Sequence, residues 1–377
     1  MNSINNIGDK NQILYANFNQ DFSCISIGTN VGYLIYNVQP LKKYIPKVIL
    51  NIIKIFFFIN IELCGGIGII EMLYKTNILA LVGGGIYPKF SINKITIWDN
   101  HQDKIISQIR FNSEVIKVKI RKDVIIGALQ DRIYIINIIT LETIDILETY
   151  NNPQGIFSIS YTSNELLIAF PYAKTKGKVQ LENFFLTLEE SQKNEQKIIN
   201  AHESQIAYIS MNNEGTILAT ASDKGTLIRI FLISRSDHPI SVLRRGKKNV
   251  KMNCLVFDLN NEIIGCTSDV GTTHVFNITE INKFINDKKH EEQKVEKKEE
   301  IMNKKEKLKI SKNTAIKLAV NERSFGKFKI QEAQSILGFY QDNRMMLITS
   351  KGTYYKVQYD TKEGCKKLEE GNIDINN

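Results

Sequence analysis

The cysteines of this chain are few and unpaired, which excludes two common kinds of site. The five are Cys24, Cys64, Cys254, Cys266 and Cys365. No two of them have the C-x-x-C spacing of a zinc site or the pattern of a disulfide framework. We therefore expect neither a bound metal nor a disulfide. The cysteine pattern fits a reducing, cytosolic setting best.

The sequence also has no clear targeting or membrane-spanning segment. Residues Met1–Asn6 lack the charged-then-apolar layout of a signal peptide. The most apolar stretch, 44–63, is interrupted by Pro46, Lys47, Asn51, Lys54, Asn60 and Glu62. Its β-branched and aromatic residues favour buried strands over a transmembrane helix.

Catalytic patterns are missing as well. The chain shows no Ser-His-Asp order, no clustered carboxylate pair and no metal-ligand spacing. Gly83-Gly84-Gly85 is not followed by the Lys-Ser/Thr of a phosphate-binding loop, so we interpret it as a turn at a strand edge. We therefore predict no enzymatic activity and no cofactor.

A repeated hairpin is what the chain does have. Seven times a short apolar strand is followed by a polar or glycine turn and a second strand of alternating pattern. The copies are Cys24–Asn37, Ile78–Gly85 continued at Lys94–Asn100, Val124–Asn137, Leu166–Asn183, Ile217–Phe231, Glu262–Asn277 and Met346–Gln358. Such recurrence is typical of propeller blades of four short strands, with a period of about 40–50 residues. The sequence predicts an all-β, seven-bladed β-propeller in which Trp98 is a core residue.

The propeller also accounts for the length of the chain. At 377 residues it exceeds the usual limit of a single core, about 250–300 residues. In a ring of blades, however, each blade packs only against its neighbours, so this limit does not apply. We expect one domain over 1–377 with a tail that is frayed after Gly371. How the ring closes is left open by the sequence, and a strand borrowed from one terminus is one way to close it. The Lys- and Glu-rich segment 287–310 is predicted to be an insertion in blade six, by default a solvated loop or loose helix.

The motif Leu243-Arg244-Arg245-Gly246 carries the main functional signal. Two consecutive arginines in an extended chain point to opposite faces, so one motif can serve two anion pockets. Short donors surround it, and a net charge of +9 favours an anionic partner. We expect Leu243 to pack inward, and we assign Asp223 and Asp269 to turn capping.

With these residues and with Phe22–Ile25, Gly83–Gly85 and Gly352–Lys356, the chain resembles the PROPPIN (WIPI-type) family of phosphoinositide-binding β-propellers. The resemblance implies two lipid pockets on blades five and six. The first would contain His202, Thr220, Ser222, Gly225, Thr226, Arg229 and Arg244. The second would contain Arg245, Gly246, Ser268, Thr272 and His274. His202 has another interpretation, because Ala201-His202 also resembles the Gly-His of WD repeats, whose histidine joins a buried hydrogen-bond network.

The family also implies partners and a location. These are membranes carrying phosphatidylinositol 3-phosphate and the 3,5-bisphosphate, autophagy proteins, and a cytoplasmic protein attached peripherally to endosomal, vacuolar or autophagic membranes. A membrane-contact loop between the last two strands of blade six would use the apolar residues Phe284, Ile285, Ile301, Met302 and Leu308. We expect a monomer. A propeller that binds only proteins is the main alternative, and nucleic acid is disfavoured because stacking aromatics are missing around the arginines.

Overall fold

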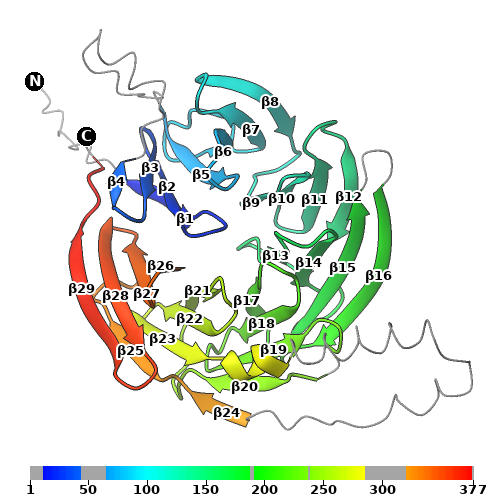
Figure 1. Ribbon diagram of the computed structural model, residues 1–377. Helices are drawn as coiled ribbons and strands as arrows, with labels where there is room; N and C mark the ends of the chain where they lie inside the picture. Colours follow the sequence, from blue (N-terminus) through cyan, green and yellow to red (C-terminus); the bar gives the residue numbers. More distant parts are fainter. Residues whose placement is uncertain (1–11, 44–64, 187–190, 237, 285–319, 376–377) are drawn as a thin grey trace, which may run out of the picture.

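The strands of the chain form seven sheets arranged as the blades of a ring (Figure 1). The computed structural model describes residues 12–43, 65–186, 191–236, 238–284 and 320–375. The predicted seven-bladed β-propeller is confirmed. In all blades except five and six, the strands follow one another along the chain, which keeps the connections short.

Blades one to four have four antiparallel strands each. Their strands in chain order are β1 (Ile13–Phe18), β2 (Cys24–Thr29), β3 (Gly32–Asn37) and β4 (Lys42–Lys43); β5 (Ile67–Met72), β6 (Ile78–Gly83), β7 (Lys94–Asp99) and β8 (Lys104–Arg110); β9 (Lys117–Ile120), β10 (Val124–Ala128), β11 (Arg132–Asn137) and β12 (Thr143–Glu148); β13 (Ser158–Ile159), β14 (Leu166–Pro171), β15 (Lys178–Leu186) and β16 (Ser191–Asn200).

Blade five departs from this plan because a fifth strand joins it. Blades five to seven comprise β17 (Ile206–Met211), β18 (Ile217–Ser222), β19 (Leu227–Leu232), β20 (Ser241–Arg244) and β24 (Val320–Arg323); β21 (Met252–Phe257), β22 (Ile263–Ser268), β23 (Thr272–Asn277) and β25 (Gly326–Lys329); β26 (Ser335–Tyr340), β27 (Arg344–Thr349), β28 (Thr353–Asp360) and β29 (Gly364–Asn372). Strand β24 pairs with β20 in parallel, at the outer edge of the blade (Figure 1).

The seven predicted hairpins are the two middle strands of the seven blades. Residues of β2, β10 and β22 are all buried, because each blade covers the faces of its neighbours. Outer strands such as β8 are largely exposed. This difference in burial explains why the middle strands have continuous apolar sequences that the outer strands lack. Trp98 is buried in a cluster with strands of blades one and two, as predicted.

The ring closes by packing of blade seven against blade one. Phe18 of β1 contacts the cluster that contains Met346 and Ile348 of β27. Within the described residues, both blades consist of consecutive strands, so a borrowed strand, one way of closing the ring that the sequence left open, is not used. Fraying does not begin directly after Gly371 either. Ile373 is buried, its N–H donates to Gly352 O at 2.8 Å, and Tyr36 Oη donates to Asp374 O at 2.7 Å.

Two segments singled out in the sequence lie outside the described residues. They are the whole of the apolar stretch 44–63 and the insertion 287–310. The chain leaves blade six after β23 and re-enters it at β25, so the insertion lies between the third and fourth strands of that blade. Among the described residues there is no helix long and apolar enough to cross a membrane.

Candidate functional site

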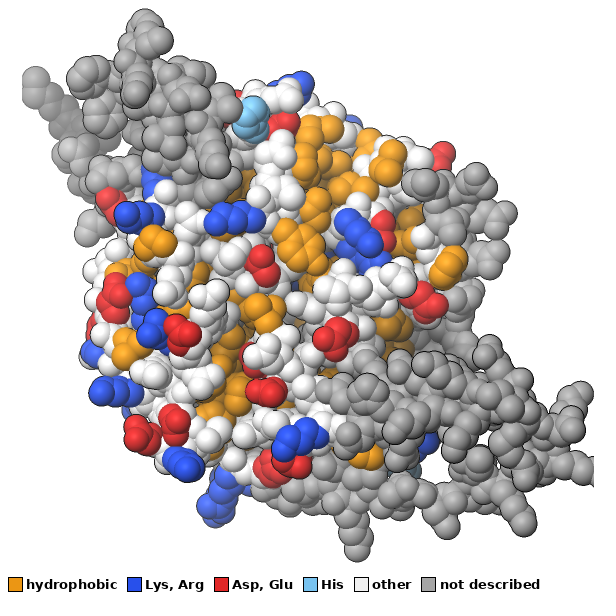
Figure 2. Space-filling model, in the orientation of Figure 1, with side chains coloured by type: hydrophobic (Ala, Val, Ile, Leu, Met, Phe, Trp, Pro, Cys, Tyr) orange, Lys and Arg blue, Asp and Glu red, His pale blue; other side chains and the backbone are white. Residues whose placement is uncertain are grey.

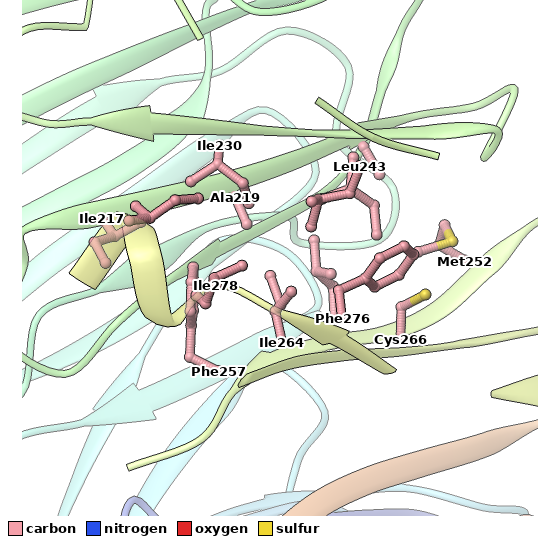
Figure 3. Close-up of a cluster of buried hydrophobic side chains, with 14 of the residues drawn as sticks. Ile217, Ala219, Ile230, Leu243, Met252, Phe257, Ile264, Cys266, Phe276 and Ile278 are labelled. Atoms are coloured by element: carbon pink, nitrogen blue, oxygen red, sulfur yellow. The ribbon is translucent and has the colours of Figure 1, made fainter. Parts of the chain in front are cut away.

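The motif Leu243-Arg244-Arg245 lies at the end of β20, and its side chains alternate between two sides. Leu243 is fully buried in the cluster between blades five and six, beside Met252 and Phe276 (Figure 3). Arg245 is also buried, with 8% of its surface exposed, whereas Arg244 between them is only half-buried. The inward packing of Leu243 is therefore confirmed. The alternation gives the two guanidinium groups different surroundings.

On the Arg244 side, blade five holds a histidine and a second arginine in fixed positions. His202 Nε2 shares a hydrogen bond with Thr220 Oγ1 at 3.0 Å. Arg229, half-buried on β19, donates through Nη1 to the Ala201 carbonyl. Burial, together with the positive charge of Arg229, lowers the pKa of His202 to about 4. A neutral imidazole and a guanidinium therefore lie side by side here.

The turn from Ser222 to Thr226 requires glycine at position 225. Gly225 has φ +58°, and a Cβ atom built on it would lie 2.2 Å from Val250 O. Its N–H donates to Ser222 O at 2.9 Å. The Thr226 carbonyl accepts from the N–H groups of Arg245 at 3.0 Å and Gly246 at 3.3 Å. This turn therefore fixes the backbone on which both arginines are mounted.

Two backbone carbonyls accept hydrogen bonds from the Arg245 guanidinium and hold it in place. Its Nε donates to Gly225 O at 2.6 Å and its Nη2 donates to Lys248 O. Burial lowers the pKa of Arg245, a sign that its charge is partly removed from water. A guanidinium carries five donor hydrogens, so these two bonds leave three for which the described residues give no partner. One arginine thus links the glycine turn to the second candidate pocket.

The second candidate pocket contains His274 of β23. His274 is 4% exposed, and its Nδ1 shares a hydrogen bond of 3.0 Å with Ser324 Oγ. Burial and the charges of Arg245 and Lys327 lower the pKa of His274 to about 4. Ser268 is fully buried, and its Oγ donates to Thr272 O at 3.2 Å. Arg245 and His274 therefore lie close together on the blade-six side.

Two of the predicted residues are fully buried and support other residues of the site. Thr220 and Ser268 have no exposed surface, so they hold His202 and the Thr272 turn in place. His202 lies in the loop between β16 and β17, and its N–H donates to Gly177 O at 2.8 Å. Its hydrogen bond with Thr220 is one that the alternative, WD-type interpretation also allows, so the role of His202 stays a prediction.

The apolar residues suggested for a membrane-contact loop are mostly not placed. Ile285, Ile301, Met302 and Leu308 lie outside the described residues. Phe284 ends a short helical turn, 279–284, and packs against the cluster between blades five and six. Phe284 is thus partly buried against the propeller, and its part in a membrane-contact loop stays a prediction.

Sequence reasoning missed two groups that the structure brings to the site. The Lys248 carbonyl accepts from Arg245, and the Ser324 hydroxyl contacts His274 across 50 positions of the chain. A backbone carbonyl leaves no mark in a sequence. Ser324 lies between β24 and β25, and a partner so far away in the chain could not be inferred from the sequence.

The low pKa values of the two histidines predict how stability changes with acidity. A histidine with a pKa near 4 when folded and about 6.5 when unfolded takes up its proton mainly in the unfolded state between these values. Stability should therefore fall as the pH is lowered from about 6.5 to about 4. We expect the loss between pH 7 and pH 5, measured by urea unfolding, to be smaller for His274→Gln than for the parent. Equal losses of stability in the parent and in His274→Gln would contradict the burial of the His274 imidazole.

Surface charge alone does not mark the site. On the face shown in Figure 2, lysine and arginine side chains are interspersed with aspartate and glutamate over the described surface. What distinguishes the site is its arrangement of residues: two arginines, two neutral histidines and a glycine turn lie on the adjoining blades five and six. These features define a class of protein, a β-propeller with two candidate basic pockets beside one arginine pair.

Comparison with known proteins gives the family. The PROPPIN family model matches residues 13–366, nearly the whole chain. Autophagy-related protein 18 of Dictyostelium discoideum is 32% identical over 275 residues, which cover 72% of this chain and 68% of that protein. Autophagy-related protein 18e of Arabidopsis thaliana is 28% identical over 95% of this chain and 86% of its own length. The chain belongs to the PROPPIN family.

Solved structures agree on the fold. Kluyveromyces lactis Hsv2 with a complete loop 6CD superposes with a TM-score of 0.70 at 19% identity, covering 97% of this chain and 100% of that one. KlAtg21 in complex with the coiled coil of AgAtg16 gives 0.68 at 21% identity, covering 96% of this chain and 100% of that one. As a PROPPIN, the chain is a phosphoinositide-binding propeller of autophagy, and a propeller that binds only proteins is not favoured.

Proposed function

We propose that the chain binds phosphatidylinositol 3-phosphate and the 3,5-bisphosphate through two pockets, one on each side of the arginine pair. The observation that carries this proposal is the different placement of Arg244 and Arg245, the second buried beside His274 and the first half-buried on the other side. Each guanidinium can form paired hydrogen bonds with phosphate oxygens. The residues are those predicted: His202, Thr220, Ser222, Gly225, Thr226, Arg229 and Arg244 for the first pocket, and Arg245, Gly246, Ser268, Thr272 and His274 for the second.

The histidines contribute as neutral donors. With pKa values of about 4, both are uncharged near neutral pH, so each can donate one N–H to a phosphate oxygen and adds no charge. The arginines supply the charge. Two weak head-group sites on one rigid frame raise the affinity for a membrane, because binding at one site places the other at a high effective concentration of lipid.

We propose that the protein acts as a recruiter and has no catalytic activity of its own. We propose that it is a cytoplasmic monomer attached peripherally to endosomal, vacuolar or autophagic membranes. KlAtg21 forms a complex with the coiled coil of AgAtg16, which supports autophagy proteins as partners. The insertion 287–310 has more lysines than glutamates, so it adds electrostatic attraction to an anionic bilayer.

Single substitutions should act on one pocket each. Thr226→Ala weakens the first pocket and His274→Ala the second. Each loses one hydrogen bond to a charged group, worth about 10- to 150-fold in affinity at that site. Calorimetric titration with the soluble head group of the 3-phosphate lipid should show two sites in the parent, and one unchanged and one weakened site in each variant. Thr143→Ala, on the exposed outer strand of blade three, is the control. A single site in the parent would rule out this division.

A further inference from the structure

The segment that returns from the insertion reaches both pockets before it enters blade six. Its residues Val320–Arg323 form β24, which pairs in parallel with β20, the strand of the arginine motif (Figure 1). The register places Arg323 beside Arg244. The next residue, Ser324, is the one that contacts His274 of the second pocket at 3.0 Å.

Arg323 and Arg244 lie on the same face of the sheet. Directly paired residues of neighbouring strands share a face and are about 4.8 Å apart at their backbones. Arg323 is exposed and Arg244 is half-buried. Like charges placed side by side on a sheet repel each other. An anion between the two guanidinium groups would turn this repulsion into attraction.

The described residues offer no protein anion for this position. In the ranges that the structure describes, neither Arg244 nor Arg323 has an ion pair. Glu322 is directly paired with Leu243, so it lies on the opposite face of β24 from Arg323. Among the described residues, no acidic side chain therefore neutralises Arg244 and Arg323.

The position of Arg323 is fixed from both directions. Before it, β24 pairs with β20; after it, the hydrogen bond between Ser324 and His274 and the strand β25 hold the chain. The backbone that carries Arg323 is therefore pre-organised, so less backbone entropy is lost when the residue binds a ligand.

We infer that Arg323 is a further phosphate ligand of the first pocket, which recognises a second phosphate on the inositol ring together with Arg244. This inference rests on the proposed function, and it assigns a preference for the bisphosphorylated head group to the segment that follows the insertion. A monophosphorylated head group would be held by Arg244 and its neighbours in blade five, whereas a bisphosphorylated one would also use Arg323.

The test compares Arg323→Gln with Arg132→Gln. Arg132 is half-exposed on blade three, so the control removes the same charge far from the pockets. Binding is measured to vesicles of equal total charge that carry either the 3-phosphate or the 3,5-bisphosphate lipid. For Arg323→Gln we expect a loss of about tenfold or more on the bisphosphate vesicles and a change of about twofold or less on the others. Arg323→Lys should recover part of the loss, because it keeps the charge.

The outcomes separate the two proposals. If the parent binds neither kind of vesicle, the proposed function fails. If the parent binds both and Arg323→Gln behaves as Arg132→Gln does, the role of Arg323 is overturned while the proposed function stands. Equal losses on both lipids would also overturn it, because Arg323 would then add general attraction and no selectivity.

Discussion

Replacing Arg244 and Arg245 together by glutamine is expected to abolish binding to vesicles that carry phosphatidylinositol 3-phosphate. In the proposed arrangement the two guanidinium groups serve different pockets, so the double variant removes the main charged donor from both. With both pockets weakened, the gain from simultaneous binding is lost as well. Co-sedimentation with the vesicles measures the effect.

Arg245 requires a control for folding, because its Nε also holds the Gly225 carbonyl. The double variant should be compared with the parent by its thermal unfolding midpoint before binding is judged. Lys247→Gln with Lys248→Gln is the matched control, since both lysines are exposed beside the motif. This pair should reduce binding only modestly and mainly at low salt. If the folded double arginine variant sediments as the parent does, the motif does not bind the lipid.

Gly225→Ala should damage the protein more than any other single methyl group added at the site. The residue has φ +58°, a conformation that costs a non-glycine residue about 1–2 kcal/mol, and the new Cβ would lie 2.2 Å from Val250 O. Relief of that contact by a backbone shift adds about 1–3 kcal/mol. We expect a total loss of about 2–5 kcal/mol in the free energy of unfolding, measured with urea.

Gly246→Ala is the matched comparison, because it adds the same methyl group beside the arginine pair in an open place. A Cβ on Gly246 meets nothing within 4 Å, so the free energy of unfolding should stay within about 0.5 kcal/mol of the parent. Gly225→Ala should also weaken head-group binding at both pockets, because the Gly225 and Thr226 carbonyls hold Arg245. Equal stability of the two variants would contradict the constraint assigned to this turn.

The blades could be predicted from the sequence because their signals are local. A hairpin such as Cys24–Asn37 shows its two strands and its turn within 14 consecutive residues, and the structure pairs Cys24 with Asn37 as that interpretation requires. Leu243 could also be placed, since alternation along an extended chain determines which side chains share a face. The arginine pair follows from the same rule.

The contacts that could not be predicted join residues far apart in the chain. The pairing of β24 with β20 and the hydrogen bond between Ser324 and His274 depend on how the chain returns across two blades. The sequence left ring closure open, with a borrowed strand as one way, and packing of Phe18 against β27 closes the ring without one. Local patterns carry no information about such contacts.

A crystal structure with the soluble head group of phosphatidylinositol 3-phosphate tests the central claim most directly. Two bound head groups are expected, one contacting Arg244 and Thr226 and the other contacting Arg245 and His274. A single head group bridging both arginines, or binding elsewhere on the ring, would contradict it.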